Sequence, residues 1–506
     1  MKKLVALLLA LVLALPAFAL AEEEVFRSYA SDFSQGTDGW YARSAGEASI
    51  SVADGALTIT GRTATWNSPG RDFPLVAGKK YTVSVEVKHD AAEPFELMIS
   101  AAHSKNGLES YENIARAKAK PGEWTTISAT YTPSSYDNYI LYVETVNFGT
   151  TDFSMRNFTV ELDEIVFDNT LPSLKELYAP YFDLGAATTL SETLDAKRMD
   201  FYASQFNILT PGNELKPDFV LDIAASRKLA KEDPSAVAVK FDNAKPLLDY
   251  CQKNGIKVHG HVLVWHSQTP EAFFREGYSS SGAFVSREVM LARLDNYVRL
   301  IMEYMEANYP GVIVSWDVVN EAINDSNGAL RESNWTKVVG DDFVNRAFEI
   351  ARKYAPEGTK LYYNDYNTPE QMKLIGISKL LDSLIADGNI DGYGFQAHYG
   401  ATTPLPSRIR AAMQEISAKG LRLRVSELDV AIDNNSEVQL RTQAYRYVAL
   451  FQIFMEYAEH IDAVQVWGVT DDLSWKASNY PLLFDAKARP KFAFHSLVEL
   501  VQPKAE

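Results

Sequence analysis

From about residue 173 onward, short apolar runs alternate with stretches in which apolar residues recur every three to four positions. The short runs predict buried strands and the periodic stretches predict helices. Eight strands are predicted, at 182–187, 208–211, 257–264, 312–319, 360–364, 392–397, 422–426 and 463–467. Predicted helices between them include 287–307, 343–354, 371–386, 407–418 and 438–457. Eight strand–helix units in about 330 residues predict a (β/α)8 TIM barrel, an α/β fold.

From about residue 25 to residue 168 the apolar positions instead recur every second residue. Runs such as 56–60, 81–87 and 139–144 are separated by Gly, Pro, Asn and Asp. Regular short strands with turn signals predict a β-sandwich. We therefore expect an N-terminal β-sandwich domain over 22–170 and a barrel domain over 171–506.

The first 21 residues have the pattern of a targeting segment. Lys2 and Lys3 precede an apolar run at 4–15, and small residues flank Leu20. This pattern predicts a secretory signal peptide over 1–21, cleaved after Ala21, and the apolar run is short for a membrane span. The expected location is secreted, or extracellular, with no membrane attachment after cleavage.

Charge and cysteine content narrow the function classes. The chain has 49 basic and 66 acidic side chains, a net charge of −17, which argues against nucleic acid and anionic membranes as partners. The one cysteine, Cys251, cannot form an internal disulfide, and its apolar helical surroundings predict core packing. A neutral polymer, bound by hydrogen bonds and stacking, is compatible with this composition. We expect a monomer.

Two glutamates lie at the C-terminal ends of predicted barrel strands. Glu321 closes the fourth predicted strand and Glu427 the seventh. The C-terminal ends of barrel strands carry the active site, whereas most glutamates lie on solvated helix faces. Two carboxyl groups that face one bond can perform glycoside hydrolysis. The pair therefore predicts that class of chemistry.

Six motifs occur at the ends of the predicted strands. They are GHVLVWHSQTP (260–270), WDVVNE (316–321), NDYN (364–367), GFQAH (394–398), SELD (426–429) and WGVTDDLSW (467–475). In this order they resemble glycoside hydrolase family 10, whose typical members are endo-1,4-β-xylanases. The resemblance covers residues 173–502.

The resemblance implies a role for each catalytic candidate. Glu321 matches the general acid/base, which must carry a proton to the departing glycosidic oxygen, and Glu427 matches the nucleophile, which must attack as an anion. His398 matches the histidine that hydrogen-bonds the nucleophile, and Asp429 the carboxylate that orients it. Asn320 matches the residue that reaches the sugar 2-hydroxyl. Such a retaining enzyme needs carboxyl groups roughly 5–5.5 Å apart.

The resemblance also implies a sugar-binding cleft around this pair. The polar candidates are Asn213, Lys216, His261, Gln268 and Gln396. The aromatic candidates are Trp265, Trp467 and Trp475, with Tyr366 on the leaving-sugar side. Indole rings can stack on the apolar C–H faces of xylose. Trp316 is expected to pack in the core.

One position departs from the family pattern. A glutamate commonly precedes the asparagine that Asn213 matches, and this chain has Gly212 there. Glu214 matches its own family position, so the missing side chain has not moved along the chain. We expect weaker hydrogen bonding to the glycone sugar next to the reacting one, with catalysis itself unaffected.

The N-terminal domain resembles carbohydrate-binding module family 22, on the stretches 38–40, 60–66, 81–84 and 141–144. The resemblance implies a xylan-binding groove lined by Arg43, Trp66, Tyr111, Tyr142 and Glu144. Residues 153–157 depart from the Asp-containing pattern expected there. A mainly structural role for this domain stays open beside ligand binding.

Three functions are compatible with these observations. The leading one is a secreted retaining endo-1,4-β-xylanase that acts on xylan and xylo-oligosaccharides. The alternatives are a β-1,4- or mixed-linkage glucanase on the same barrel, and a non-catalytic carbohydrate-binding protein. The reaction implies no metal and no organic cofactor, and a structural calcium ion in the sandwich, whose ligands the sequence does not identify, is not predicted.

Overall fold

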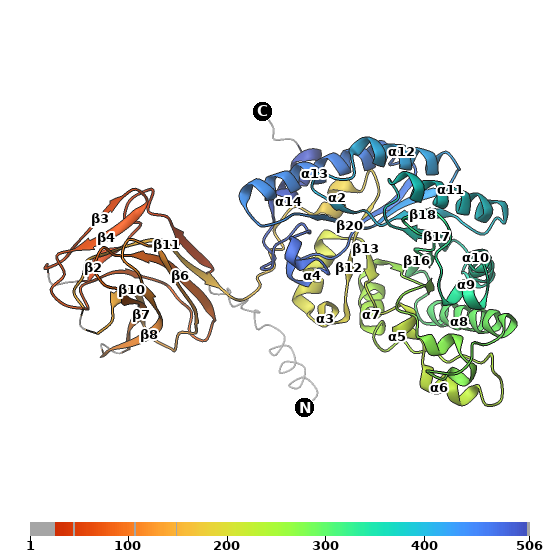
Figure 1. Cartoon of the computed structure of the whole chain (residues 1–506), viewed down its shortest axis with the longest axis horizontal. Helices are drawn as coiled ribbons and strands as arrows, with labels where there is room; N and C mark the ends of the chain where they lie inside the picture. The colour runs from red at the N-terminus through yellow and green to blue at the C-terminus, as the bar shows by residue number, and fades with distance from the viewer. Residues whose placement is uncertain (1–25, 44–45, 106–107, 148, 503–506) are drawn as a thin grey trace, which may run out of the picture. The chain divides into compact units, whose positions relative to one another are not determined.

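The computed structural model describes residues 26–43, 46–105, 108–147 and 149–502 (Figure 1). The predicted signal peptide, 1–21, lies outside the described residues. The chain divides into two compact units between Ile165 and Val166, whereas the sequence placed the join at 170/171. Each unit is described by itself.

The N-terminal unit is built from two antiparallel sheets. The first contains, in order, β3 (Ser49–Ala53), β4 (Ala56–Thr60), β11 (Phe153–Leu162), β6 (Tyr81–Lys88) and β9 (Thr125–Tyr131), with β1 (Ser28–Ser31) paired to β11. The second contains β2 (Tyr41–Arg43), β5 (Ser68–Asp72), β10 (Asn138–Thr145), β7 (Phe95–Lys105) and β8 (Leu108–Ala119). Burial alternates along β6, so one face of the sheet lies in the core. The predicted sandwich is confirmed.

The C-terminal unit is a closed parallel barrel. Its strands are β12 (Asp183–Thr188), β13 (Ile208–Pro211), β14 (Lys257–Gly260) with β15 (Val264–Trp265), β16 (Ile313–Asn320), β17 (Lys360–Asp365), β18 (Gly392–Phe395), β20 (Arg422–Ala431) and β21 (Ile461–Val466). Each strand pairs with its sequence neighbours, β14 pairs with β16, and β12 pairs with β21, which closes the ring. The predicted barrel is confirmed.

Helices surround the barrel strands (Figure 1). They are α2 (Leu174–Tyr178), α3 (Leu190–Thr193), α4 (Ala196–Gln205), α5 (Pro217–Val220), α6 (Ile223–Leu229), α7 (Lys245–Asn254), α8 (Arg287–Asn308), α9 (Asn334–Val338), α10 (Phe343–Tyr354), α11 (Gln371–Ala386), α12 (Pro406–Ser417), α13 (Glu437–Glu456) and α14 (Phe492–Val501). Each longer helix turns an apolar face inward, as α10 does with Phe343, Val344, Ala347, Phe348 and Ala351.

Two strands differ most from their predicted limits. The predicted strand 257–264 is interrupted after Gly260, where an added Cβ would lie 2.3 Å from the ring of Trp316, so the backbone passes against the buried indole. The predicted strand 422–426 continues to Ala431, because it gains a second partner in β19 (His398–Gly400). Glu427 therefore lies inside a strand, and the prediction that it closes one was wrong.

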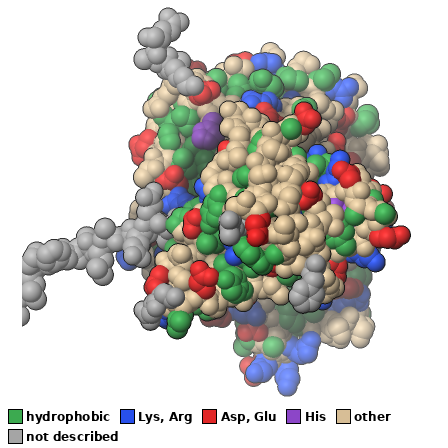
Figure 2. All heavy atoms as spheres, turned by 90° about the vertical axis from the view of Figure 1, so that its left-hand side faces the viewer, with side chains coloured by type: hydrophobic (Ala, Val, Ile, Leu, Met, Phe, Trp, Pro, Cys, Tyr) green, Lys and Arg blue, Asp and Glu red, His purple; other side chains and the backbone are tan. Residues whose placement is uncertain are grey.

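The described residues contain no helix with both the length and the apolar character to cross a membrane. Charged side chains of both signs are present on the face shown in Figure 2.

Candidate active site

Glu427 is held from both sides at the bulged part of β20. Its backbone N–H donates to the Gln396 carbonyl at 3.0 Å, and the pairing with β21 shifts register between Val425 and Leu428. Its Oε1 accepts from Asn364 Nδ2 at 2.7 Å, and its Oε2 lies 3.2 Å from His398 Nε2. The side chain is nearly buried, so these contacts define its orientation.

His398 links Glu427 to a second carboxylate. His398 and Asp429 are register partners on β19 and β20, and His398 Nδ1 lies 2.7 Å from Asp429 Oδ2. Burial disfavours the charged imidazole, but Asp429 and Glu427 outweigh burial and raise the pKa of His398 to about 9. Asp429 also accepts from Trp475 Nε1 at 2.9 Å and from Lys476 Nζ at 3.1 Å. Burial works against the charged Asp429 as well, yet His398 and Lys476 lower its pKa.

Glu321 lies directly after β16, where the backbone turns away from the barrel. Its φ of 57° is in the left-handed region, which costs a residue with a side chain about 1 kcal/mol. Trp265 Nε1 donates to Oε2 at 3.1 Å, and Gln396 Nε2 donates to Oε1 at 2.9 Å. Asn320 Nδ2 lies 3.2 Å from the same Oε1. The carboxyl group therefore faces neutral donors.

Asn364 links the hydrogen bonds around Glu321 to those around Glu427, and it is not among the site residues predicted from the sequence. Its Nδ2 lies 3.1 Å from Asn320 Oδ1 as well as 2.7 Å from Glu427 Oε1, and its Oδ1 accepts from Ser426 Oγ at 2.6 Å. A Cβ at Gly394 would lie 2.4 Å from that Oδ1, so glycine leaves the space for the amide. The available signal was its place in the motif 364–367.

A cleft of about 800 Å³ opens over this pair. It is lined by Asn213, Lys216, His261, Trp265, Gln268, Asn320, Glu321, Tyr366, Gln396, His398, Glu427, Trp467 and Trp475. Of the barrel candidates, Asp429 alone is not part of the lining, because it is buried behind His398. Further lining residues, which were not predicted from the sequence, include Glu192, Asn367, Ser474 and Lys476. Trp316 packs in the core, 1% exposed.

A cation and two amides form one polar edge of the cleft. Lys216 Nζ donates to Asn213 Oδ1 at 3.1 Å and to Gln268 Oε1 at 2.9 Å. Burial lowers the pKa of Lys216, opposed by the charges of Glu427 and nearby carboxylates. Gly212 lies beside this group, and a Cβ there would be 3.5 Å from the Thr188 carbonyl, an ordinary contact. The backbone at 212 can therefore carry a side chain.

The aromatic candidates surround the catalytic pair. The ring of Trp467 lies edge-on to His261, with centroids 5.4 Å apart, and that of Trp475 lies edge-on to His398, at 4.9 Å. Trp475 is 63% exposed, so much of its indole is open for stacking. His261 is oriented by Asp317, since its Nδ1 lies 2.8 Å from Asp317 Oδ2.

In the N-terminal unit, four of the five candidates lie on the sheet β2–β5–β10–β7–β8. Tyr142 and Glu144 are two positions apart on β10, so their side chains share one face of the sheet. Tyr111 of β8 is the register partner of Ala102 on β7, and Ala102 is the partner of Ile140 on β10, so Tyr111 lies on the same face. The guanidinium of Arg43 lies 3.8 Å from the Tyr142 ring centroid.

Two further contacts shape this face. Gly70 leaves the space for Arg43, because a Cβ there would be 2.4 Å from Arg43 Cδ. Ser100 Oγ donates to Glu144 Oε1 at 2.8 Å. The fifth candidate, Trp66, lies in the loop before β5 and is 49% exposed.

A parallel barrel that presents two glutamates, hydrogen-bonding amides and open indoles in one cleft defines a glycoside hydrolase. The pattern of Glycosyl hydrolase family 10 matches residues 173–500, and the chain belongs to this family. Residues 28–149 match a carbohydrate binding domain. The expected resemblance is confirmed in both parts of the chain.

Similar proteins cover most of this chain. Endo-1,4-beta-xylanase Y of Acetivibrio thermocellus is 34% identical over 487 residues, which is 90% of this chain and 43% of that protein. Endo-1,4-beta-xylanase B of Butyrivibrio fibrisolvens is 37% identical over 337 residues, 65% of this chain and 53% of that protein. The chain thus spans about half or less of the length of these curated relatives.

A solved structure resembles the chain over both units. It is the N-terminal CBM22-1–GH10 portion of endo-1,4-beta-D-xylanase 10B of Clostridium thermocellum, complexed with xylohexaose. It is 30% identical with a TM-score of 0.62, covering 94% of this chain and 96% of that one.

We predict that the protonated His398 stabilises the folded state and that this stabilisation is lost at alkaline pH. Its pKa of about 9 lies above the usual 6.5, so the folded state binds the extra proton between these values. The stabilisation is complete below pH 6.5 and is lost as pH rises through 9. The contribution of His398 to the free energy of unfolding is up to about 3 kcal/mol, since a tenfold change in proton affinity is worth about 1.4 kcal/mol.

Thermal unfolding of the wild type and of His398→Gln between pH 6 and 9.5 measures this effect. The stability advantage of the wild type should shrink across the window, whereas replacing the exposed His495 by glutamine should leave the wild-type pH dependence intact. A constant difference between wild type and His398→Gln would contradict the assignment of a charged imidazole.

Proposed function

We propose that the chain is a secreted, retaining endo-1,4-β-xylanase that hydrolyses internal β-1,4-xylosidic bonds of xylan. The observation that carries this proposal is the difference between the surroundings of the two glutamates. A charged imidazole lies beside Glu427, which suits a carboxylate that attacks as an anion. Neutral N–H donors contact the carboxyl group of Glu321 instead, which leaves it the acid/base role in the pair.

In the proposed mechanism, Glu427 attacks the anomeric carbon while Glu321 gives its proton to the glycosidic oxygen. The glycosidic C–O bond breaks, the leaving sugar departs as an alcohol, and a glycosyl ester forms on Glu427. Glu321, now a carboxylate, then takes a proton from water, which attacks the anomeric carbon and releases Glu427. Two inversions give net retention. Asn320 and Asn364 keep both carboxyl groups aimed at one sugar.

The names of the relatives support xylan as the substrate, as does the xylohexaose in the similar structure. The glucanase alternative has support of its own, because a protein named Exoglucanase XynX of Acetivibrio thermocellus is 29% identical over 500 residues. Glucose carries a hydroxymethyl arm that xylose lacks, so a glucanase must leave room for it. Trp467 and Trp475 beside the catalytic pair favour xylose.

The remaining parts of the proposal come from the sequence. The pattern of residues 1–21 supports export of the mature chain. The double displacement uses carboxyl groups and water, so we propose that the enzyme works without a metal or organic cofactor. We propose a monomer.

Sugar release from glucuronoxylan, arabinoxylan and carboxymethylcellulose tests the activity and its specificity. We expect release from the xylans alone, and Glu427→Ala should lower the rate by about a thousandfold or more. Glu415→Ala, at an exposed position of α12, is the matched control and should stay active. NMR of the first product should show the β-anomer. Activity in Glu427→Ala would rule out the assigned nucleophile, and an initial α-anomer would rule out retention.

Restoring a carboxylate at position 212 should strengthen glycone binding. Gly212→Glu places a hydrogen-bonding group beside the Asn213–Lys216 edge, where the backbone has room for it. One charge-assisted hydrogen bond of about 1.5 kcal/mol would lower the Michaelis constant for short xylo-oligosaccharides about tenfold. Gly212→Ala is the control, because it replaces the glycine without adding a carboxylate, and its Michaelis constant should match that of the wild type. An unchanged Michaelis constant and cleavage pattern in Gly212→Glu would refute the idea.

We propose that the N-terminal unit binds xylan on the face defined by Arg43, Tyr142 and Glu144. Xylohexaose titrated into full-length Glu427→Ala should occupy two sites, the cleft and this face. Adding Trp66→Ala and Tyr111→Ala should leave one site, because both rings are exposed and available for stacking. Tyr445→Ala, an exposed tyrosine of α13, should keep two. If Glu427→Ala itself binds xylohexaose at a single site, ligand binding by the N-terminal unit would be ruled out and its role would be structural.

A further inference from the structure

The backbone segment 321–323 leaves the sheet immediately after β16. Its first residue, Glu321, has a left-handed φ of 57°. Backbone carbonyls that leave a sheet lose their ladder partners and need other donors. The Glu321 N–H still donates to the Asn364 carbonyl at 2.9 Å. The carbonyls of Glu321 and Ile323 instead accept hydrogen bonds from cationic side chains.

Arg331 binds both ends of this segment. Its Nε donates to the Glu321 carbonyl at 2.9 Å, and its Nη2 donates to the Ile323 carbonyl at 3.2 Å. Nη2 also lies 3.1 Å from the hydroxyl of Tyr366, which lines the cleft. A planar guanidinium with these three contacts restricts rotation of the segment.

Lys373, from α11, binds the same segment from the other side. Its Nζ lies 2.6 Å from the Ile323 carbonyl, 2.9 Å from Asp325 Oδ1 and 2.8 Å from Asp365 Oδ1. An ammonium group has three donors, and here all three have an acceptor. Lys373 and Asp365 are both fully buried. Burial raises the pKa of Asp365 to about 6, against the opposing effect of Lys373.

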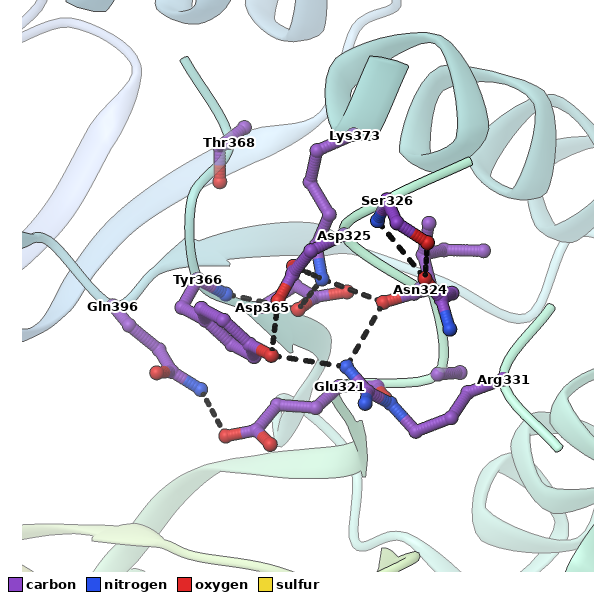
Figure 3. Close-up of polar contacts among 12 residues, drawn as sticks. Glu321, Asn324, Asp325, Ser326, Arg331, Asp365, Tyr366, Thr368, Lys373 and Gln396 are labelled. Atoms are coloured by element: carbon purple, nitrogen blue, oxygen red, sulfur yellow. Dashed lines mark hydrogen bonds and ion pairs between the residues drawn. The ribbon is translucent and has the colours of Figure 1, made fainter. Parts of the chain in front are cut away.

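Two tyrosines complete the arrangement. Tyr363 accepts the N–H of Ala322 at 2.9 Å and donates to Asp365. Tyr366 donates to Asp325, which also contacts Lys373. Figure 3 shows Lys373 reaching from its helix toward both aspartates and Arg331 lying beside Tyr366, while the carboxyl group of Glu321 points to Gln396. The backbone of Glu321 is thus held by charged groups that lie behind its carboxyl group.

We propose that Arg331 and Lys373 are positioning residues that aim the Glu321 carboxyl group by holding the segment 321–323. The inference rests on the proposed function, in which Glu321 is the acid/base. Hydrogen bonds from cations are stronger than neutral ones and so suit a backbone that is not in its relaxed conformation. Rotation about the Glu321 backbone would swing the carboxyl group away from the glycosidic oxygen, while Glu427, on β20, would stay in place.

Aryl β-xylobiosides distinguish aiming of the acid from general damage. A phenol leaving group needs a proton from Glu321, whereas a dinitrophenolate leaves without one. In Arg331→Met and Lys373→Met, kcat/KM for the phenyl substrate should fall about 10–100-fold, the usual effect of a misplacement near 1 Å. For the dinitrophenyl substrate it should stay within about threefold. Lys379→Met, at an exposed position of the same helix, is the control and should match the wild type.

Azide provides a second readout. Azide needs no base, so it can attack the anomeric carbon of the glycosyl-enzyme, forming a C–N bond as the ester C–O bond to Glu427 breaks. Azide should therefore raise kcat on the dinitrophenyl substrate in Arg331→Met and Lys373→Met and yield the β-glycosyl azide. The wild type and Lys379→Met should show no such increase.

Equal losses on both substrates, or no loss on either, would overturn the positioning role. If Lys373→Met does not fold, two other variants provide the same comparison. They are Arg331→Met, at a half-buried position, and Tyr363→Phe, which removes the hydroxyl that accepts the Ala322 N–H. A wild type that cleaves neither xylobioside would instead overturn the proposed function, and the positioning role with it.

Discussion

The hydrogen bond between Asn320 and Asn364 is the interaction on which the cleft depends. The two residues are register partners on β16 and β17, and their amides connect the carboxyl group of Glu321 to that of Glu427. A slip of one residue in either strand would turn an amide to the opposite side of the sheet. The register of the barrel therefore sets the relation between two glutamates that are far apart in sequence.

The charged groups near the Asn320–Asn364 hydrogen bond are arranged differently around the two glutamates. Glu427 has the His398–Asp429 pair next to its side chain, whereas Glu321 has cations on its backbone and neutral donors on its carboxyl group. Taking such charges out of water is costly unless partners are in place. One barrel can thus present two chemically identical side chains in two different environments.

Most of the fold was predictable because hydrophobic periodicity is a local property. The predicted helices 343–354 and 371–386 have the observed limits, and all eight barrel strands occur. The errors came from contacts across the barrel. The strand 422–426 is longer because β19 pairs with its end, and 257–264 is interrupted where the backbone passes Trp316. Most cleft residues were predicted from motifs, whereas Asn364 and Lys373 gain their significance from partners distant in sequence.

The sequence by itself determined the two-part architecture, the strand–helix order and the identity of the chemistry-bearing residues, since all of these are written in local patterns. The tertiary structure alone decided how those residues combine. It placed the neutral donors on Glu321 and the charged histidine beside Glu427, and it brought Lys373 against the Ile323 carbonyl. Barrel closure sets these pairings, because only closure brings the ends of nonadjacent strands and helices to within hydrogen-bonding distance.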